Sequence, residues 1–213
     1  MAQGAAGSDQ ISPTRTELLT RSAQIRLARQ GAELLRGKRE ALVREFLSEL
    51  RHFIDTRDAL RRELSEAKQS LMRALAIDGP EAVLSAGFAS RRPIAVETRE
   101  RNIWGTKVAE VSADYAPRGP GERGFTAAGA SARIEETAER FESTLELILR
   151  VAPLDRKLAR LAEEIRRTSR RVNALEQRLL PTLGEQVRYI RGVLDQRERE
   201  DVLRLKHLKK RRA

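Results

Sequence analysis

The 213-residue chain contains no cysteine, and only 4% of its residues are aromatic. The absence of cysteine excludes disulfide bonds and thiolate metal sites, and it is compatible with a reducing cytoplasm. Few aromatic residues combined with 34% charged residues suit long solvent-exposed helices better than a thick globular core. We therefore expect a helical protein whose surface is large relative to its core.

The chain also lacks long apolar runs. No stretch reaches the 18 or so apolar residues that a membrane-spanning helix needs, so we expect no such span. The first ten residues are small and polar, without the basic start and apolar stretch of a signal peptide. We expect residues 1–11 to form a disordered tail.

Glycine and proline are sparse and concentrate in the middle of the chain. Asp78-Gly79-Pro80 is a strong helix-ending signal, and a short helix is expected over residues 81–88. The alternation of Ile94, Val96 and Thr98, with a β-rich segment over residues 103–111, predicts a small β-hairpin. A Gly/Pro-rich turn or loop follows over residues 116–124. Residues 78–130 are therefore expected to form a small irregular tip domain.

A sustained heptad pattern predicts a long C-terminal helix over residues 131–210. Apolar side chains recur at alternating steps of four and three residues from Leu154 to Leu179, and the run continues through Leu183 to Leu194. This mean spacing of about 3.5 keeps one apolar seam on one side of a helix and supercoils it around a partner. Pro153 and Pro181 are expected to interrupt or kink this helix.

A matching seam predicts an N-terminal helix over residues 12–77. Its apolar positions follow one seven-residue register that only Arg39 breaks, and Gly31 and Gly37 are interpreted as points of bending or close approach. The residues expected in the seam of the two helices are Leu18, Ile25, Leu35, Leu42, Phe46, Phe53, Leu161, Ile165, Val172, Leu175, Leu179 and Ile190.

Two long helices joined by about 50 residues can fold back on one another. The expected fold class is therefore all-α: a long antiparallel two-helix coiled coil formed by the N- and C-terminal helices, with a tip that contains a short helix and a β-hairpin. Both termini would then lie at the same end. Trp104, the only tryptophan, is expected to anchor the tip, and a contact with a partner protein is the alternative.

The formal net charge is +11, and its excess is concentrated near the C-terminus. Residues 188–213 contain 10 basic and 4 acidic side chains, a net charge of +6. This segment is either a solvated helix end, whose cations complement the helix dipole, or a contact for an acidic partner. No aromatic side chains are interleaved to stack on bases, which disfavours nucleic acid as that partner.

No catalytic constellation is visible. His52 and His207 are far apart in sequence and fit no metal-ligand spacing. Gly119, Gly121 and Gly124 form a GxGxxG string without the strand and helix that a phosphate-binding loop requires, so a turn is expected there. We therefore expect no catalytic residues, no metal and no cofactor.

Several sequence strings resemble those of a known family. The first helix carries ISPTR over residues 11–15 and KREALVREF over residues 38–46, and the second carries RRVNALE over residues 170–176, LP at 180–181 and LDQRERE over residues 194–200. NIWGTKV over residues 102–108 is similar too. The chain resembles the D subunit of the V-type and A-type (archaeal-type) rotary ATPases over both long helices.

The resemblance implies the role of a central rotor shaft. Such a subunit transmits torque between ATP turnover in a hexamer of A and B subunits and ion movement by a membrane ring, and it does not itself hydrolyse ATP. The implied partners are the A and B subunits, the small F subunit, and the C-type (or d-type) subunit that links the shaft to the ring. The implied location is cytoplasmic, at the membrane periphery, without membrane insertion or nucleic acid.

Within this family role, we expect cationic side chains near both termini to face acidic loops of the hexamer. They are Arg15, Arg21, Arg26, Arg188, Arg197, Arg199, Arg204 and Lys206. Surfaces near residues 40–75 and 131–165 are expected to bind the F subunit. The remaining alternative is a basic coiled-coil adaptor that binds nucleic acid or an anionic membrane; the γ-type shaft of F-type synthases is excluded, because it encloses an α/β domain for which about 50 residues are too few.

Overall fold

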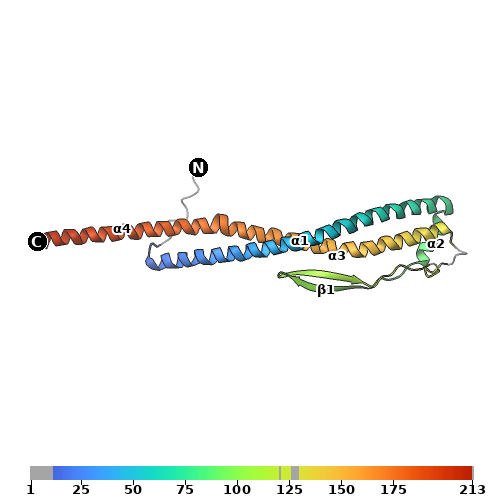
Figure 1. The fold of residues 1–213 in the computed structure, drawn as a ribbon, viewed down its shortest axis with the longest axis horizontal. Helices are drawn as coiled ribbons and strands as arrows, with labels where there is room; N and C mark the ends of the chain where they lie inside the picture. The colour runs from blue at the N-terminus through green and yellow to red at the C-terminus, as the bar shows by residue number, and fades with distance from the viewer. Residues whose placement is uncertain (1–11, 120, 126–129, 213) are drawn as a thin grey trace. The chain divides into compact units, whose positions relative to one another are not determined.

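The computed structural model describes residues 12–119, 121–125 and 130–212, so the expected tail over residues 1–11 lies outside the described residues. The elements, in chain order, are α1 (Arg15–Asp78), α2 (Pro80–Ala89), β1 (Val96–Ile103), β2 (Thr106–Ala113), α3 (Ala132–Ala174), the π-helical turn η1 (Leu175–Leu179) and α4 (Leu180–Arg212). Figure 1 shows this succession. A long N-terminal helix, a long C-terminal helix, a short helix and a two-stranded antiparallel hairpin confirm the expected fold class.

The chain divides into two compact units. The terminal unit consists of residues 1–40 and 165–213, and the central unit consists of residues 41–164. Helices α1 and α3 each contribute to both units.

In the terminal unit, the start of α1 pairs antiparallel with the helices near the C-terminus. Arg15 forms an ion pair with Glu198 at 2.7 Å, and Arg36 forms one with Glu176 at 2.5 Å, so the partners run in opposite order. Side chains with 0–8% exposure form the seam between these helices: Ala28, Ala32, Thr168, Val172, Leu183, Val187 and Ile190.

A one-residue phase shift interrupts the heptad at η1. Leu175, Leu179, Leu183 and Val187 are separated by three successive steps of four, one residue more than the heptad allows. An extra residue would rotate the following seam by about 100°, and a π-helical turn absorbs it because it holds one more residue per closed ring. Val172 before the turn and Leu183 after it are both buried, whereas Leu179 is 42% exposed and lies off the buried face.

The two prolines act differently from the expected interruption. Pro153 lies inside α3, which runs through it without ending. Pro181 is the second residue of α4, directly after η1. A proline ring clashes with the carbonyl four residues earlier in an α-helix. For Pro181 that carbonyl belongs to Gln177, which lies inside the π-helical turn, where each hydrogen bond closes a wider ring. The second long helix is therefore adjusted at Pro181 rather than broken.

In the central unit, residues 41–78 of α1 pair antiparallel with residues 132–164 of α3. Small side chains at Ala67, Ser70 and Ala74 are 0–2% exposed, and the Ser70 and Thr137 hydroxyls share a 2.7 Å hydrogen bond in the interior. Leu42 and Leu161 are fully buried larger side chains of this unit.

The other residues predicted for the seam, taken over both units, are less buried. Half-buried ones are Leu18, Ile25, Leu35, Phe46, Phe53, Ile165 and Leu175.

The tip is built on the end of α1 and the start of α3. Arg133 donates two hydrogen bonds to the carboxylate of Asp78, at 2.9 and 3.1 Å, and so joins the two helix ends. Gly79 takes a φ of +86°, which separates α1 from α2. Ala74, Ala86 and Ile134 form a small buried cluster with Val83, Phe125 and Ala130 around it.

Trp104 does not anchor this tip, contrary to the first of its two interpretations. It is 61% exposed, because it occupies the two-residue turn between β1 and β2 with Gly105. Both turn residues have positive φ values, +50° and +78°, as the favoured hairpin turns require. The indole therefore projects from the end of the hairpin.

Gly31 and Gly37 are not points of close approach. A Cβ built on either glycine would meet no atom within 4 Å beyond its chain neighbours and the nearby backbone of its own helix. Gly124 differs, because it has a φ of +79° and an added Cβ would lie 2.4 Å from the carbonyl oxygen of Ala89. Gly124 is therefore the position where the loop after β2 presses against the end of α2.

These environments predict opposite effects of the same substitution. Gly37→Ala should stabilise the chain by about 0.5–1 kcal/mol, because alanine costs less backbone entropy in a helix. Gly124→Ala should destabilise it by more than about 1 kcal/mol, because of the clash and the positive φ. Thermal unfolding followed by circular dichroism measures both, and a lower melting temperature for Gly37→Ala would contradict this account of α1.

Candidate partner-binding surfaces

The two units differ sharply in charge. Residues 1–40 and 165–213 contain 22 basic and 10 acidic side chains, a net charge of +12. Residues 41–164 contain 20 basic and 21 acidic side chains, a net charge of −1. The entire positive excess of the chain therefore belongs to the terminal unit, which would attract an acidic partner.

Some of the predicted cationic side chains hold the two chain ends together. Arg197 donates a 3.2 Å hydrogen bond to the carbonyl oxygen of Pro13, and Arg15 pairs with Glu198. Arg21 pairs with Glu17 on its own helix at 2.7 Å. Part of the predicted set is therefore engaged within the unit.

The other predicted cations are exposed: Arg26, Arg188, Arg199, Arg204 and Lys206. Arg204 lies 3.9 Å from Asp201, and Arg199 borders a shallow hollow with Val202 and Leu203. The structure thus places all eight predicted residues in one unit, where Arg21 is half-buried and the other seven are exposed.

Helix α4 continues past its last contact with the start of α1. Figure 1 shows its C-terminal end extending beyond the first turn of α1. Every side chain over residues 199–211 is exposed, including four large apolar ones: Val202, Leu203, Leu205 and Leu208, at 51–65%. An exposed helix that mixes leucines with cations suits burial in a partner's interior.

A second candidate surface lies on α2 of the central unit. Glu81 is the only charged residue of this ten-residue helix, and Ala86 is its only buried one. Leu84 and Phe88 are each 61% exposed, and the guanidinium of Arg91 lies 4.2 Å from the centre of the Phe88 ring. A helix that is apolar on all sides is normally covered, so α2 has the character of an interface.

A cleft adjoins α2, and further apolar side chains are exposed near the end of α1. The cleft of about 280 Å³ lies against α2, lined by residues that include Leu71 of α1, Val83 of α2, Ile134 of α3 and Phe125 of the loop before α3. Met72 and Ile77 near the end of α1 are 66% and 64% exposed. The apolar tip surface is defined here as Met72, Ile77, Leu84 and Phe88.

A buried ionic cluster fixes the loop after β2 to α3, and sequence reasoning missed it. The side chain of Arg123 is 3% exposed and that of Glu142 is 10% exposed, and they lie 3.2 Å apart. Arg118 donates to Glu142 from its backbone amide and from its guanidinium, both at 2.9 Å. Arg123 also pairs with Glu135.

The cluster controls the ionisation of Glu142. Burial raises the pKa of this carboxyl, but hydrogen bonds from Arg118 and Arg123 outweigh burial, so its pKa lies below the ordinary value. For Arg123, burial has the opposite sign and lowers the pKa. Glu142 and Glu135 more than reverse that effect, so the pKa of Arg123 is raised. The cluster is therefore fully ionised near neutral pH.

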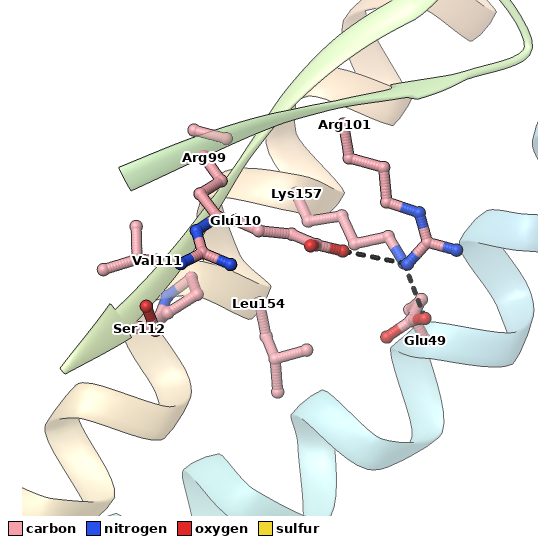
Figure 2. Close-up of a pocket in the computed structure, with 10 residues that line it drawn as sticks. Glu49, Arg99, Arg101, Glu110, Val111, Ser112, Leu154 and Lys157 are labelled. Atoms are coloured by element: carbon pink, nitrogen blue, oxygen red, sulfur yellow. Dashed lines mark hydrogen bonds and ion pairs between the residues drawn. The ribbon is translucent and has the colours of Figure 1, made fainter. Parts of the chain in front are cut away.

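A groove separates the hairpin from the helices of the central unit. Figure 2 shows Arg99 and Arg101 of β1 and Glu110, Val111 and Ser112 of β2 on one side, with Leu154 and Lys157 of α3 and Glu49 of α1 on the other. This part of the groove measures about 450 Å³, and an adjoining hollow of about 630 Å³ extends to His52 and Tyr115.

Charged side chains in the groove are largely paired. Lys157 bonds to Glu49 at 2.7 Å and to Glu45 at 2.9 Å, and Arg101 bonds to Glu110 at 2.9 Å. Burial lowers the pKa of Lys157, but Glu49 and Glu45 more than compensate, so its pKa is raised. This part of the groove therefore presents fixed ion pairs and a few apolar side chains.

Within residues 12–119, 121–125 and 130–212, no helix is both long and apolar enough to cross a bilayer. In the same described part of the chain, no three or more His, Asp or Glu side chains are gathered as metal ligands would be.

Comparison with known proteins decides the family. The profile of the family described as the D subunit of ATP synthase matches residues 17–210. The chain belongs to the ATP synthase D-subunit family. It is 42% identical over 200 residues to the V-type ATP synthase D subunit of Thermus thermophilus, which covers 94% of this chain and 88% of the relative. It is 38% identical over 199 residues to the A-type ATP synthase D subunit of Thermococcus kodakarensis, covering 93% of each.

The resemblance drawn from the sequence strings is thereby confirmed. The D subunit is a central-stalk subunit of V/A-type rotary ATPases, and the match spans both units of this chain.

The ionic cluster predicts how the stability of the central unit changes with pH. Glu142→Gln should destabilise the central unit by about 3 kcal/mol, because it leaves the buried Arg123 and the half-buried Arg118 without their shared partner. Since the pKa of Glu142 is lowered from its ordinary 4.5, the stabilisation is present above about pH 4.5 and is lost as pH falls further.

Urea unfolding of the wild type and of Glu142→Gln between pH 3 and 7 measures this difference. Glu146→Gln is the matched control, because Glu146 forms an exposed pair with Arg150 within α3. A difference between wild type and Glu142→Gln that stayed constant down to pH 3 would rule out the cluster as its source.

Proposed function

We propose that this D subunit is the rotor shaft of its complex and transmits torque between ATP turnover in a hexamer of A and B subunits and ion translocation by a membrane ring. In this role it is non-catalytic: it carries force between sites that other subunits provide. It acts at the cytoplasmic face of a membrane without inserting into it. The observation that carries the proposal is the difference between the surfaces of the two units. The terminal unit carries the positive charge, and the central unit is close to neutral and exposes an apolar helix.

The terminal unit suits the interior of the hexamer. Its net charge of +12 is spread over exposed side chains rather than gathered in one deep pocket. Exposed ion pairs are each worth about 0–1 kcal/mol, so contacts with acidic loops can form and break as the shaft turns. The unpaired end of α4, with its exposed leucines and cations, would occupy the bearing of the hexamer.

The central unit suits partners on the membrane side. The apolar tip surface fits the subunit that links the shaft to the membrane ring. The helix surfaces near residues 40–75 and 131–165, with the groove beside the hairpin, are the proposed site of the F subunit. The groove lies beside Glu49 and His52 of α1 and residues 146–157 of α3, within these ranges.

The shaft proposal predicts stoichiometric recovery of a rotary complex. A tagged chain, isolated from gently solubilised native membranes with nuclease added and analysed by mass spectrometry, should retain the A, B and F subunits. Recovery of nucleic-acid proteins, or of none of these subunits, would instead favour the basic coiled-coil adaptor.

The bearing residues can be tested by charge reversal. Arg199→Glu with Arg204→Glu should weaken assembly with the hexamer and lower coupled turnover, because both cations are exposed beyond the paired part of the terminal unit. Arg197→Glu serves as a comparison, since Arg197 also bonds to Pro13 and its loss should lower stability as well. Unchanged assembly and turnover in the double variant would refute the assignment of these cations.

The tip can be tested separately. Leu84→Ser with Phe88→Ser should weaken binding of the ring-linking subunit by at least about tenfold, because two large apolar side chains lose their burial in the interface. Since both are exposed in the free chain, its melting temperature should change little. Unaltered binding would place the link to the ring elsewhere.

A further inference from the structure

A cluster of arginines stands on the exposed face of α3 in the terminal unit. Arg166, Arg167, Arg170 and Arg171 occupy four of six successive positions, and all four are exposed. Between them Thr168 is 2% exposed and belongs to the buried seam. The packing of this segment is therefore provided by Thr168 and its neighbours in the seam, and the guanidinium groups face outwards.

Helical spacing makes the cluster self-repelling. Arg166 and Arg170 are neighbours at the i,i+4 spacing, and so are Arg167 and Arg171. Like charges at this spacing destabilise a helix by about as much as opposite charges stabilise it. These two like-charge pairs thus oppose the stability of α3.

Nearby carboxylates do not neutralise these arginines. Glu163 pairs with Arg160 at 3.2 Å, and Glu176 pairs with Arg36 on α1 at 2.5 Å. In the described part of the chain, none of the four arginines has a hydrogen bond or ion pair. Within the described part of the chain, these exposed guanidinium groups are left to solvent and can pair with carboxylates of a partner.

We propose that Arg166, Arg167, Arg170 and Arg171 form a docking site for acidic protein loops, separate from the unpaired end of α4. The inference rests on the proposed function, in which those loops belong to the hexamer that surrounds the terminal unit. Arginine suits this contact because its planar guanidinium binds a carboxylate through two parallel hydrogen bonds. The site adds a contact about 30 residues before the predicted bearing at the end of the helix.

The test compares a quadruple Arg→Gln variant at these four positions with wild type, both purified with the F subunit and added to isolated A–B hexamer. We expect the association rate to fall about tenfold or more at low salt, and the difference to shrink at about 1 M salt, where charges are screened within about 3 Å. The melting temperature of the variant should be equal to or above that of wild type, because the internal repulsion is removed.

A control variant at the same four positions sharpens the comparison. Quadruple Arg→Lys at the cluster keeps the charge and should retain most of the association rate.

Three outcomes would overturn the proposal. Equal association rates and salt dependence for wild type and the cluster variant would show that the four arginines do not contact the hexamer, while leaving the shaft function intact. A lower melting temperature for the cluster variant would show that the arginines stabilise the fold instead. Failure of the wild type itself to bind the hexamer would refute the proposed function on which the inference rests.

Discussion

The constraint on which this structure depends is the burial of one narrow apolar stripe on each long helix. With few aromatic residues and no cysteine, the chain has neither a thick core nor covalent cross-links to hold it. In the terminal unit, Val172, Leu183 and Ile190 must therefore face α1 although the heptad slips by one residue between them. The π-helical turn over Leu175–Leu179 absorbs that residue, and Pro181, two residues after it, occupies a place where an undistorted α-helix would clash.

Because the core is narrow, most side chains are exposed to solvent. The exposed side chains differ in kind between the two units. The terminal unit carries all of the positive excess, whereas the central unit is close to neutral and exposes an apolar helix instead. Within the central unit, the charged cluster of Arg118, Arg123 and Glu142 is buried, so it fixes the loop after β2. Ionic contacts thus hold the tip together inside the central unit, whereas charged side chains of the terminal unit face outwards.

Much of this arrangement was predictable from the sequence, because periodicity and helix-breaking residues are local signals. The seven-residue register predicted both long helices, and Asp78-Gly79-Pro80 predicted the end of the first. The three successive steps of four from Leu175 to Val187 are visible in the sequence too, but only the backbone shows that a π-helical turn absorbs them and leaves Leu179 exposed. The interpretation of Trp104 as an anchor failed because the hairpin register, which is set by pairing across the strands, places it in the turn. The pairing of Arg123 with Glu142 depends on how a loop folds back on a helix, which no local pattern encodes.

The central claim, that this D subunit is a rotating shaft, is tested most directly by observing rotation. Because the chain has no cysteine, Lys107→Cys near the hairpin turn provides a single thiol for attaching a gold particle, and the hexamer can be fixed to a surface. The account predicts unidirectional rotation of the particle that requires ATP and stops when ATP is removed. Hydrolysis of ATP by the hexamer, with the shaft bound but the particle stationary, would contradict it.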